Sequence, residues 1–346
     1  MPATMITHVR IQNFRSFLDA EVDLQPFSLI VGANGSGKTN LLKFIVAISG
    51  PAQPTNSQGA LLGGLATPGS PCVLVDPGWI IHQNGSDQPV GFQVKMNGAT
   101  VTGSIGNAAG RILLSSALPW QGKGLVIFNI NPEKVSAVEQ TVPFATVKAT
   151  GEGTAQVLDT LKNGDREDLF EKIEENFRRY VPEVEKLSLR TVENGKKQIQ
   201  VREKGLKVSV PATELSEGTR LILCILTILH QENPPPVILL EDIDRGMHPR
   251  LFEYVAPLMR DIAERNKINI LATTHNPYLV DCFQDQKDAV IIVEKKDGAS
   301  TLTTLAKKIE GLDYETVDPE DMPLGSLWYS GLVGGAPKKL SSEVRH

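Results

Sequence analysis

The sequence predicts an α/β protein in which a mixed, largely parallel sheet carries an antiparallel β lobe and a helical insertion. Three observations lead to this prediction. Apolar β-rich runs alternate with helical patterns in the C-terminal third, the order of βαβ units. Strand-like runs between residues 72 and 130 are separated by turn dipeptides such as Asn84-Gly85 and Asn97-Gly98. Between these regions, apolar residues from 169 to 181 recur at helical spacing.

Composition limits the classes of protein that this chain can form. Its 346 residues are 41% hydrophobic and 22% charged, which describes a globular chain of two domains or one elaborated domain. The net charge of −5 means that any nucleic-acid site must be a local patch. The longest apolar stretch, 221–229, is far short of the roughly 20 residues that span a bilayer. Without a signal-peptide pattern, we expect a cytoplasmic protein that contacts no membrane.

The first seventy residues predict strands, a helix and a loop in that order. Alternating apolar residues predict short strands near 6–11 and 22–24, and the run 27–31 predicts a buried strand because glycine ends it. A helix starts at Lys38 and ends before Gly50-Pro51. Residues 51–70 are rich in Pro, Gly and Ser, which predicts a mobile surface loop.

The remaining elements follow the same reasoning. Alternation predicts a hairpin with strands near 187–190 and 198–202 around the turn Asn194-Gly195. Helices are expected at 221–229 and 251–262, and buried strands at 237–240, 268–272 and 289–293. Three scattered cysteines, none in a CxxC pair, predict plain buried thiols rather than a disulfide framework or a zinc site.

A phosphate-binding loop connects the strand 27–31 to the helix that starts at Lys38. Residues 32–39 fit the pattern GxxxxGK[ST] in this strand–helix context. Backbone N–H groups would surround the phosphates, Lys38 would reach the β- and γ-phosphates, and the Thr39 hydroxyl would ligate Mg²⁺. This pattern alone leaves a kinase, a GTPase and an ATPase open. The expected nucleotide-binding residues are Gly32, Asn34, Gly35, Ser36, Gly37, Lys38, Thr39 and Asn40.

Two acids follow the buried strand 237–240. Beside a phosphate-binding loop, Glu241 would hold Mg²⁺ and Asp242 would polarise the attacking water. About twenty residues earlier, Leu215-Ser216-Glu217-Gly218 opens the apolar helix 221–229. Further on, Thr273-Thr274-His275 ends the strand 268–272.

This order of motifs resembles the ATP-binding-cassette (ABC) ATPases, whose LSxG signature opens a helix. The resemblance implies that Ser216 and Gly218 contact the γ-phosphate held by a second subunit, so that two ATP molecules are enclosed in a head-to-tail homodimer. It also implies that His275 contacts the γ-phosphate and the water. Catalysis would then rest on Lys38, Asp242 and His275, with ATP and Mg²⁺ as cofactors.

Other segments are similar to the RecF, SMC and OLD group, and to its stand-alone bacterial OLD-like predicted ATPases. They are Ile11-Gln12-Asn13-Phe14-Arg15-Ser16-Phe17, the segment 241–249, and Leu324-Gly325-Ser326-Leu327-Trp328. In this group Arg15 would touch the nucleotide, although a plain surface arginine is an equal alternative. Asp242 and Asp244 stand where glutamate is usual, and Ile243 replaces a proline. The Mg²⁺-sensing glutamine of the family is not placed.

The resemblance divides the chain into an ABC ATPase core at 1–50 and 205–320, an antiparallel β lobe at 51–150, a helical insertion with a β-hairpin at 151–204, and a tail at 321–346. We expect an ATPase that regulates a separate effector, such as a nuclease or toxin, in nucleic-acid surveillance or anti-phage defence. The alternatives are a RecF-like repair ATPase and a nucleotide-gated scaffold with little hydrolysis. A small-molecule kinase would leave residues 215–218 unexplained. The sequence contains no second cluster of carboxylates that would predict a nuclease site in the chain itself.

DNA or RNA binding is open. The basic residues in and after the hairpin could form a strip that faces nucleic acid, although solvated hairpins commonly look the same. These residues are Lys196, Lys197, Arg202, Lys204 and Lys207.

Overall fold

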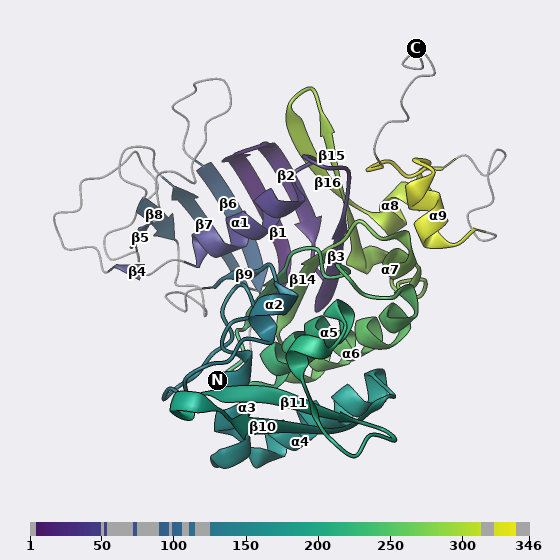
Figure 1. The fold of residues 1–346 in the computed structure, drawn as a ribbon. Coiled ribbons are helices and arrows are strands. Elements are labelled where there is room, and N and C mark those ends of the chain that lie inside the picture. Colours follow the sequence, from purple (N-terminus) through teal and green to yellow (C-terminus); the bar gives the residue numbers. More distant parts are fainter. Residues whose placement is uncertain are drawn as a thin grey trace, which may run out of the picture. The chain divides into compact units, whose positions relative to one another are not determined.

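The structure, a computed structural model, describes residues 5–49, 52–53, 72–74, 90–96, 99–105, 111–114, 125–312 and 322–336. Figure 1 labels its helices and strands along the chain. The structure divides into two compact units, each made of separate chain segments. Unit 1 holds residues 1–125, 236–239 and 263–346, and unit 2 holds 126–235 and 240–262. Among the described residues, no helix combines the length and the apolar character that crossing a membrane requires.

Unit 1 contains an antiparallel sheet with the strand order β2-β1-β6-β7-β8-β5-β4. Its first two strands continue the alternation seen in the sequence, because Val9 and Ile11 are buried while Arg10 points outward. The strands are β1 (Ile6–Phe14), β2 (Phe17–Asp23), β4 (Ala52–Gln53), β5 (Cys72–Leu74), β6 (Val90–Met96), β7 (Ala99–Ile105) and β8 (Arg111–Leu114).

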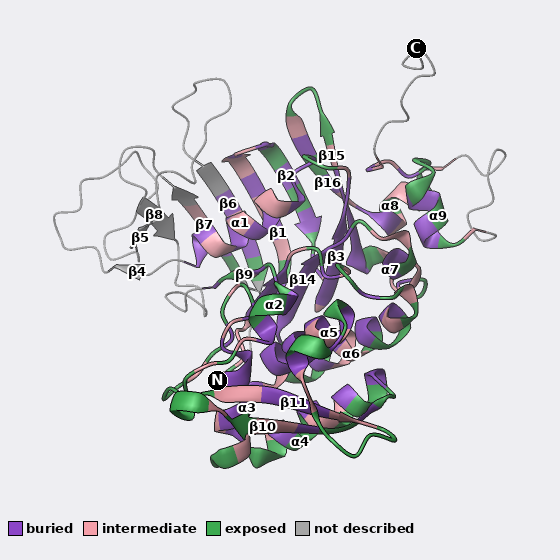
Figure 2. Cartoon of the chain, viewed as in Figure 1, coloured by how far each residue is buried: buried purple, intermediate pink, exposed green. Residues whose placement is uncertain are grey.

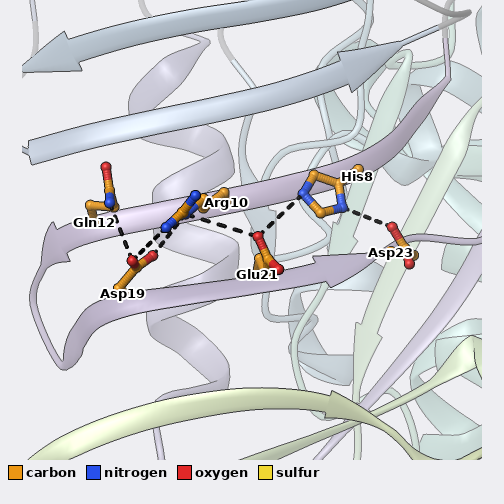
Figure 3. Close-up of polar contacts among 6 residues, drawn as sticks. All are labelled: His8, Arg10, Gln12, Asp19, Glu21 and Asp23. Atoms are coloured by element: carbon orange, nitrogen blue, oxygen red, sulfur yellow. Dashed lines mark hydrogen bonds and ion pairs between the residues drawn. The ribbon is translucent and has the colours of Figure 1, made fainter. Parts of the chain in front are cut away.

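Polar side chains pair across the outward face of β1 and β2 (Figure 3). Arg10 donates two hydrogen bonds to Asp19, at 2.9 and 2.7 Å, and His8 lies 2.7 Å from the carboxylate of Asp23. The Arg10 guanidinium holds the pKa of the Asp19 carboxyl below its usual value. A one-residue slip would bring these charges to the buried face, so the pairs favour the observed register.

The second sheet of unit 1 carries the phosphate-binding loop. The strands of this sheet that have residues in unit 1 follow the order β16-β15-β3-β14-β13, with β3 (Phe27–Val31) parallel to both β14 (Asn269–Thr273) and β15 (Val290–Lys296). β16 (Ala299–Thr304) pairs antiparallel with β15. Every residue of β3 and β14 is buried, as expected for strands covered on both faces (Figure 2).

Helix α1 (Lys38–Ile48) packs between the two sheets of unit 1. Its Phe44 ring makes edge-to-face contacts with Phe14 of β1 and Phe92 of β6, with ring centres 5.5 and 5.7 Å apart. The helix also contacts β14. A β/α/β sandwich therefore fixes the first turn of α1 at the carboxyl end of β3. Unit 1 also contains α7 (Pro277–Asp281), α8 (Leu305–Glu310) and α9 (Leu324–Tyr329).

Unit 2 is built from helices packed on a small sheet with the order β10-β11-β12. The apolar stripe expected near 169–181 is buried in α4, at Phe170, Ile173 and Phe177. Its elements are β9 (Ile127–Phe128), α2 (Pro132–Val135), α3 (Thr154–Asn163), α4 (Glu167–Tyr180), β10 (Val184–Thr191), β11 (Lys197–Glu203), β12 (Val210–Pro211) and α5 (Glu217–His230). β13 (Val237–Leu240) and α6 (Phe252–Asn266) have residues in both units.

The structure confirms the α/β class, the parallel sheet, the antiparallel lobe and the hairpin, and it adds elements that periodicity did not predict. The hairpin loop is longer than the expected two-residue turn, because Thr191 pairs with Lys197 and a short 3-10 turn lies between them. β16, α3, α8 and α9 were not predicted. Within the expected tail, Leu324, Leu327 and Trp328 of α9 are buried, and α9 contacts α7. The expected mobile loop at 51–70 falls almost wholly outside the described residues.

Candidate nucleotide-binding site

The phosphate-binding loop of unit 1 closes around the ammonium group of Lys38. Lys38 Nζ donates to the carbonyls of Gly32 at 2.8 Å and Ala33 at 3.1 Å, and the residue is only 7% exposed. A lysine this deeply buried is unusual unless its charge is compensated. The loop therefore holds a cation at the amino end of α1, the end of a helix that favours anions.

Two glycines make this tight curve possible. A Cβ on Gly32 would lie 2.4 Å from the carbonyl oxygen of Val293, so no larger residue fits there. Gly37 has φ +119 and stands at the N-cap of α1 without a side-chain capping hydrogen bond. Beside it, Ser36 Oγ is buried and has no hydrogen-bond partner among the described residues. An uncapped helix start, a buried unpaired hydroxyl and a buried lysine together fit a phosphate group.

Arg15 lies in the turn between β1 and β2. Its φ of +53 is rare outside glycine, asparagine and aspartate, and its guanidinium carbon lies 5.8 Å from the ring centre of Phe14. Arg15 Nε is buried without a hydrogen-bond partner among the described residues. The neighbouring Asn40 donates to Ser16 Oγ at 2.9 Å. Asn40 thus holds this turn, a contact that the motif did not predict.

His275 follows β14, the strand directly beside β3. The backbone N–H of Thr274 donates to the carbonyl of Ile30 at 3.2 Å, so the ends of the two parallel strands stay together. The His275 side chain is exposed. Unit 1 therefore gathers the phosphate-binding loop, the Arg15 turn and His275 in one framework.

Unit 2 holds the acidic pair. The Glu241 N–H donates to the carbonyl of Phe128 at 2.8 Å, and the amide of Asn129 donates to the Glu241 carboxylate at 3.2 Å. Asp242 has φ +49 and is exposed. Aspartate adopts left-handed backbone more readily than most residues, so this turn places an exposed carboxylate just after β13.

Asn129 is the contact that sequence reasoning missed. The apolar run 125–130 predicts a strand, and no motif in the sequence marks Asn129 as a site residue. The observed strand β9 ends at Phe128, so Asn129 begins the following loop. The available signal was a polar side chain directly after a short apolar run.

The signature segment begins α5, also in unit 2. Ser216 is the N-cap, its Oγ accepts from the Thr219 N–H at 3.1 Å, and the residue is exposed. Gly218 is buried, and a Cβ there would lie 2.7 Å from the carbonyl oxygen of Gly246. Packing within unit 2 thus accounts for this glycine without any partner subunit.

The basic hairpin of unit 2 is partly neutralised. Lys197 Nζ lies 3.1 Å from the buried carboxylate of Asp159, and Arg202 makes two hydrogen bonds to Glu185 at 3.0 and 3.2 Å. These partners weaken the case for a continuous cationic strip.

Two protein families match parts of this chain, and solved structures share its fold. Residues 5–78 match a family described as “AAA ATPase domain”, and residues 155–281 match one described as “AAA domain, putative AbiEii toxin, Type IV TA system”. No curated protein matches. An SMC head solved with the C-winged helix domain of ScpA superposes with a TM-score of 0.58 at 15% identity, covering 88% of this chain and 99% of that one.

Two further SMC heads superpose as well. One has an extended coiled coil, is bound to the C-terminal domain of ScpA and derives from Pyrococcus furiosus; its TM-score is 0.51 at 15% identity, with 91% and 100% of the two chains covered. The other, with a coiled coil and joint, derives from Pyrococcus yayanosii; its TM-score is 0.53 at 12% identity, with the same coverage. The chain has the fold of an ABC-type, SMC-like P-loop ATPase.

Proposed function

We propose that the chain binds ATP at residues 32–40 and hydrolyses it. The observation that carries this proposal is the buried Lys38 ammonium, enclosed by the carbonyls of Gly32 and Ala33 beside the uncapped start of α1. The Lys38 ammonium and the backbone N–H groups at this helix start are the donors that the β- and γ-phosphates of ATP would contact. The unpaired Ser36 Oγ and Arg15 Nε are further donors for the nucleotide.

The proposal includes Mg²⁺, for which two of the motifs contain oxygen ligands. The Thr39 hydroxyl and the Glu241 carboxylate are the hard oxygen donors that Mg²⁺ prefers, and they would hold it. Bound Mg²⁺ would neutralise charge that develops on the phosphate oxygens. The Asn129 amide, 3.2 Å from the Glu241 carboxylate, would keep that carboxylate oriented.

Hydrolysis would depend on Asp242 and His275. Asp242 would polarise the attacking water and His275 would contact the γ-phosphate. The aspartate is one methylene shorter than the glutamate usual in ABC-type ATPases, so we expect slow turnover.

A second copy of the chain would complete the site. Ser216 is exposed at the start of the 14-residue helix α5, a position suited to an anion held by a partner. Ser216 and Gly218 would contact the γ-phosphate across the interface, forming a head-to-tail homodimer that encloses two ATP molecules. ATP binding would close this dimer and hydrolysis would open it.

The dimer would control a separate effector, such as a nuclease or toxin, in nucleic-acid surveillance or anti-phage defence. Support comes from the toxin–antitoxin description of the family matched at 155–281, and from SMC heads solved with ScpA bound. A RecF-like repair ATPase that contacts DNA or RNA and a scaffold that hardly hydrolyses ATP are the alternatives.

ATP turnover by the purified chain, measured as phosphate release with and without DNA or RNA, separates these functions. We expect slow release by the parent chain and none by Asp242→Asn, while both bind ATP equally. Asp244→Asn, which changes a neighbouring acid, is the matched control. Phosphate release by Asp242→Asn at the parent rate would contradict the catalytic role of Asp242, and no release by the parent would favour the scaffold. Strong stimulation by DNA would favour the repair ATPase.

A further inference from the structure

Ser300 lies between the phosphate-binding loop and the turn that carries Arg15. It is the second residue of β16, it is 2% exposed, and it comes from the opposite end of the sequence. Its Oγ donates to the carbonyl oxygen of Ser36 at 2.5 Å, and its N–H donates to the carbonyl of Ser16 at 2.6 Å. Ser300 belongs to none of the sequence motifs described above.

The contact with Ser36 fixes the direction of a peptide group. In a trans peptide the carbonyl and the following N–H point in opposite directions. By holding the Ser36 carbonyl, the Ser300 hydroxyl therefore directs the Gly37 N–H away from β16. That N–H stands at the N-cap of α1, among the donors that would surround a phosphate.

Gly37 cannot hold this orientation by itself. Its φ of +119 belongs to a region that glycine visits freely, so the Ser36–Gly37 peptide needs an external contact to stay in one orientation. The Ser300 hydroxyl lies close enough that a Cβ on Gly37 would come within 2.7 Å of it, and within 3.0 Å of Ser16 Oγ. Two serines from distant parts of the chain therefore enclose this glycine.

The support for Ser300 is rigid. β16 pairs along its length with β15, and β15 pairs with β3, the strand that leads into the loop. Asn40 of α1 donates to Ser16 Oγ at 2.9 Å, which ties the Arg15 turn to the same cluster. Ser300 thus joins the sheet, the loop and the Arg15 turn through two short hydrogen bonds.

We propose that Ser300 is a positioning residue that orients the Ser36–Gly37 peptide for phosphate binding. The proposal rests on the proposed function, since it takes the phosphate of ATP as the ligand. Ser300 touches no nucleotide in this account. It acts through the backbone of the loop, and its loss would leave the loop intact but free to rotate this peptide.

The test compares Ser300→Ala with two control variants on the same strand. Thr301→Ala removes an exposed hydroxyl at the next position, and Leu302→Ala removes a buried apolar side chain two positions along the strand. Two measurements are made on each protein: hydrogen exchange of the Gly37 amide without nucleotide, and the dissociation constant of ATP with Mg²⁺ by calorimetry at a temperature where all variants are folded.

We expect Ser300→Ala to speed exchange at Gly37 and to weaken ATP binding about five- to tenfold, the size of one lost hydrogen bond. Thr301→Ala should match the parent in both measurements. Leu302→Ala should unfold at a lower temperature than Ser300→Ala and yet bind ATP with the parent's affinity. Loss of stability alone would then not explain the weaker ATP binding of Ser300→Ala.

Parent-like exchange and affinity in Ser300→Ala would overturn the proposal, as would an equal loss of affinity in Leu302→Ala. A parent chain that binds no ATP would instead contradict the proposed function. The exchange measurement without nucleotide would still decide whether Ser300 holds the peptide, so the two failures are distinguishable.

Discussion

At the scale of single residues, the contacts of individual side chains decide how the acidic pair is held. The motif in the sequence predicts that Glu241 and Asp242 act together, but it contains no information on what holds the Glu241 carboxylate. The structure supplies Asn129, which comes from a segment more than a hundred residues earlier in the chain. Such a partner depends on the tertiary fold, so periodicity and motif spacing could not find it.

The Asn129 contact gives a prediction at this scale. Asn129→Ala removes a donor that orients the Glu241 carboxylate, and altered outer contacts typically cost 10- to 100-fold in metal affinity or activity. We therefore expect the Mg²⁺ concentration for half-maximal ATP turnover to rise by about tenfold. Titration of turnover against Mg²⁺ measures this change.

Asn131→Ala is the matched control, because the Asn131 side chain caps α2 by accepting from the Glu133 N–H at 2.9 Å. It should lower the unfolding temperature while leaving the Mg²⁺ dependence unchanged. An unchanged Mg²⁺ dependence in Asn129→Ala would remove Asn129 from the site.

At the scale of secondary-structure elements, the sequence predicts some strands and misses others. The runs 27–31 and 237–240 were predicted because they are short, apolar and ended by glycine or acids, and both strands are found. β16 was missed because its sequence, Ala-Ser-Thr-Leu-Thr-Thr, carries little apolar signal. It forms by pairing with β15, and this pairing places Ser300 against the loop.

The start of α5 carries a prediction at the element scale. Ser216→Arg places a large cation where the proposed dimer would bring the γ-phosphate of the partner copy. We expect ATP binding by the monomer to persist and ATP-dependent dimerisation to fail in light scattering. Thr213→Arg, which adds the same side chain at an exposed position before the signature, should dimerise normally. Normal ATP-dependent dimers of Ser216→Arg would contradict the composite site.

A buried carboxyl at the start of α3 gives a pH dependence. Glu139 Oε1 accepts from the Gly153 N–H at 2.6 Å, and burial raises the pKa of the Glu139 carboxyl above its usual 4.5. The folded state thus favours the protonated form, and this contribution to stability is lost as the pH rises through the raised pKa.

Glu139→Gln keeps an acceptor for Gly153 and removes the charge. In the parent chain, Glu139 should lower the unfolding temperature as the pH rises from 4.5 to 7. We expect this decrease to be absent in Glu139→Gln. Glu133→Gln, an exposed change of equal charge, should keep the parent profile. A parent-like profile in Glu139→Gln would refute this assignment.

At the scale of the whole molecule, the candidate residues form two sets. Unit 1 holds the phosphate-binding loop, Arg15 and His275, and unit 2 holds Ser216, Gly218 and the acidic pair. The order of motifs along the chain was enough to predict the ABC-type fold, because each motif has a fixed place in the strand–helix order. The division into units crosses β13 and α6, and no composition shift in the sequence marks it.

Calorimetric titration of ATP with Mg²⁺ into the parent chain and Lys38→Ala tests the central claim most directly. The buried ammonium balances the phosphates in this account, and loss of one partner of a buried charged contact costs about 2–5 kcal/mol. The parent should therefore bind ATP and Lys38→Ala should give no detectable binding, with both proteins folded by circular dichroism. Equal affinity of the two proteins would contradict the assignment of residues 32–40 as the nucleotide site.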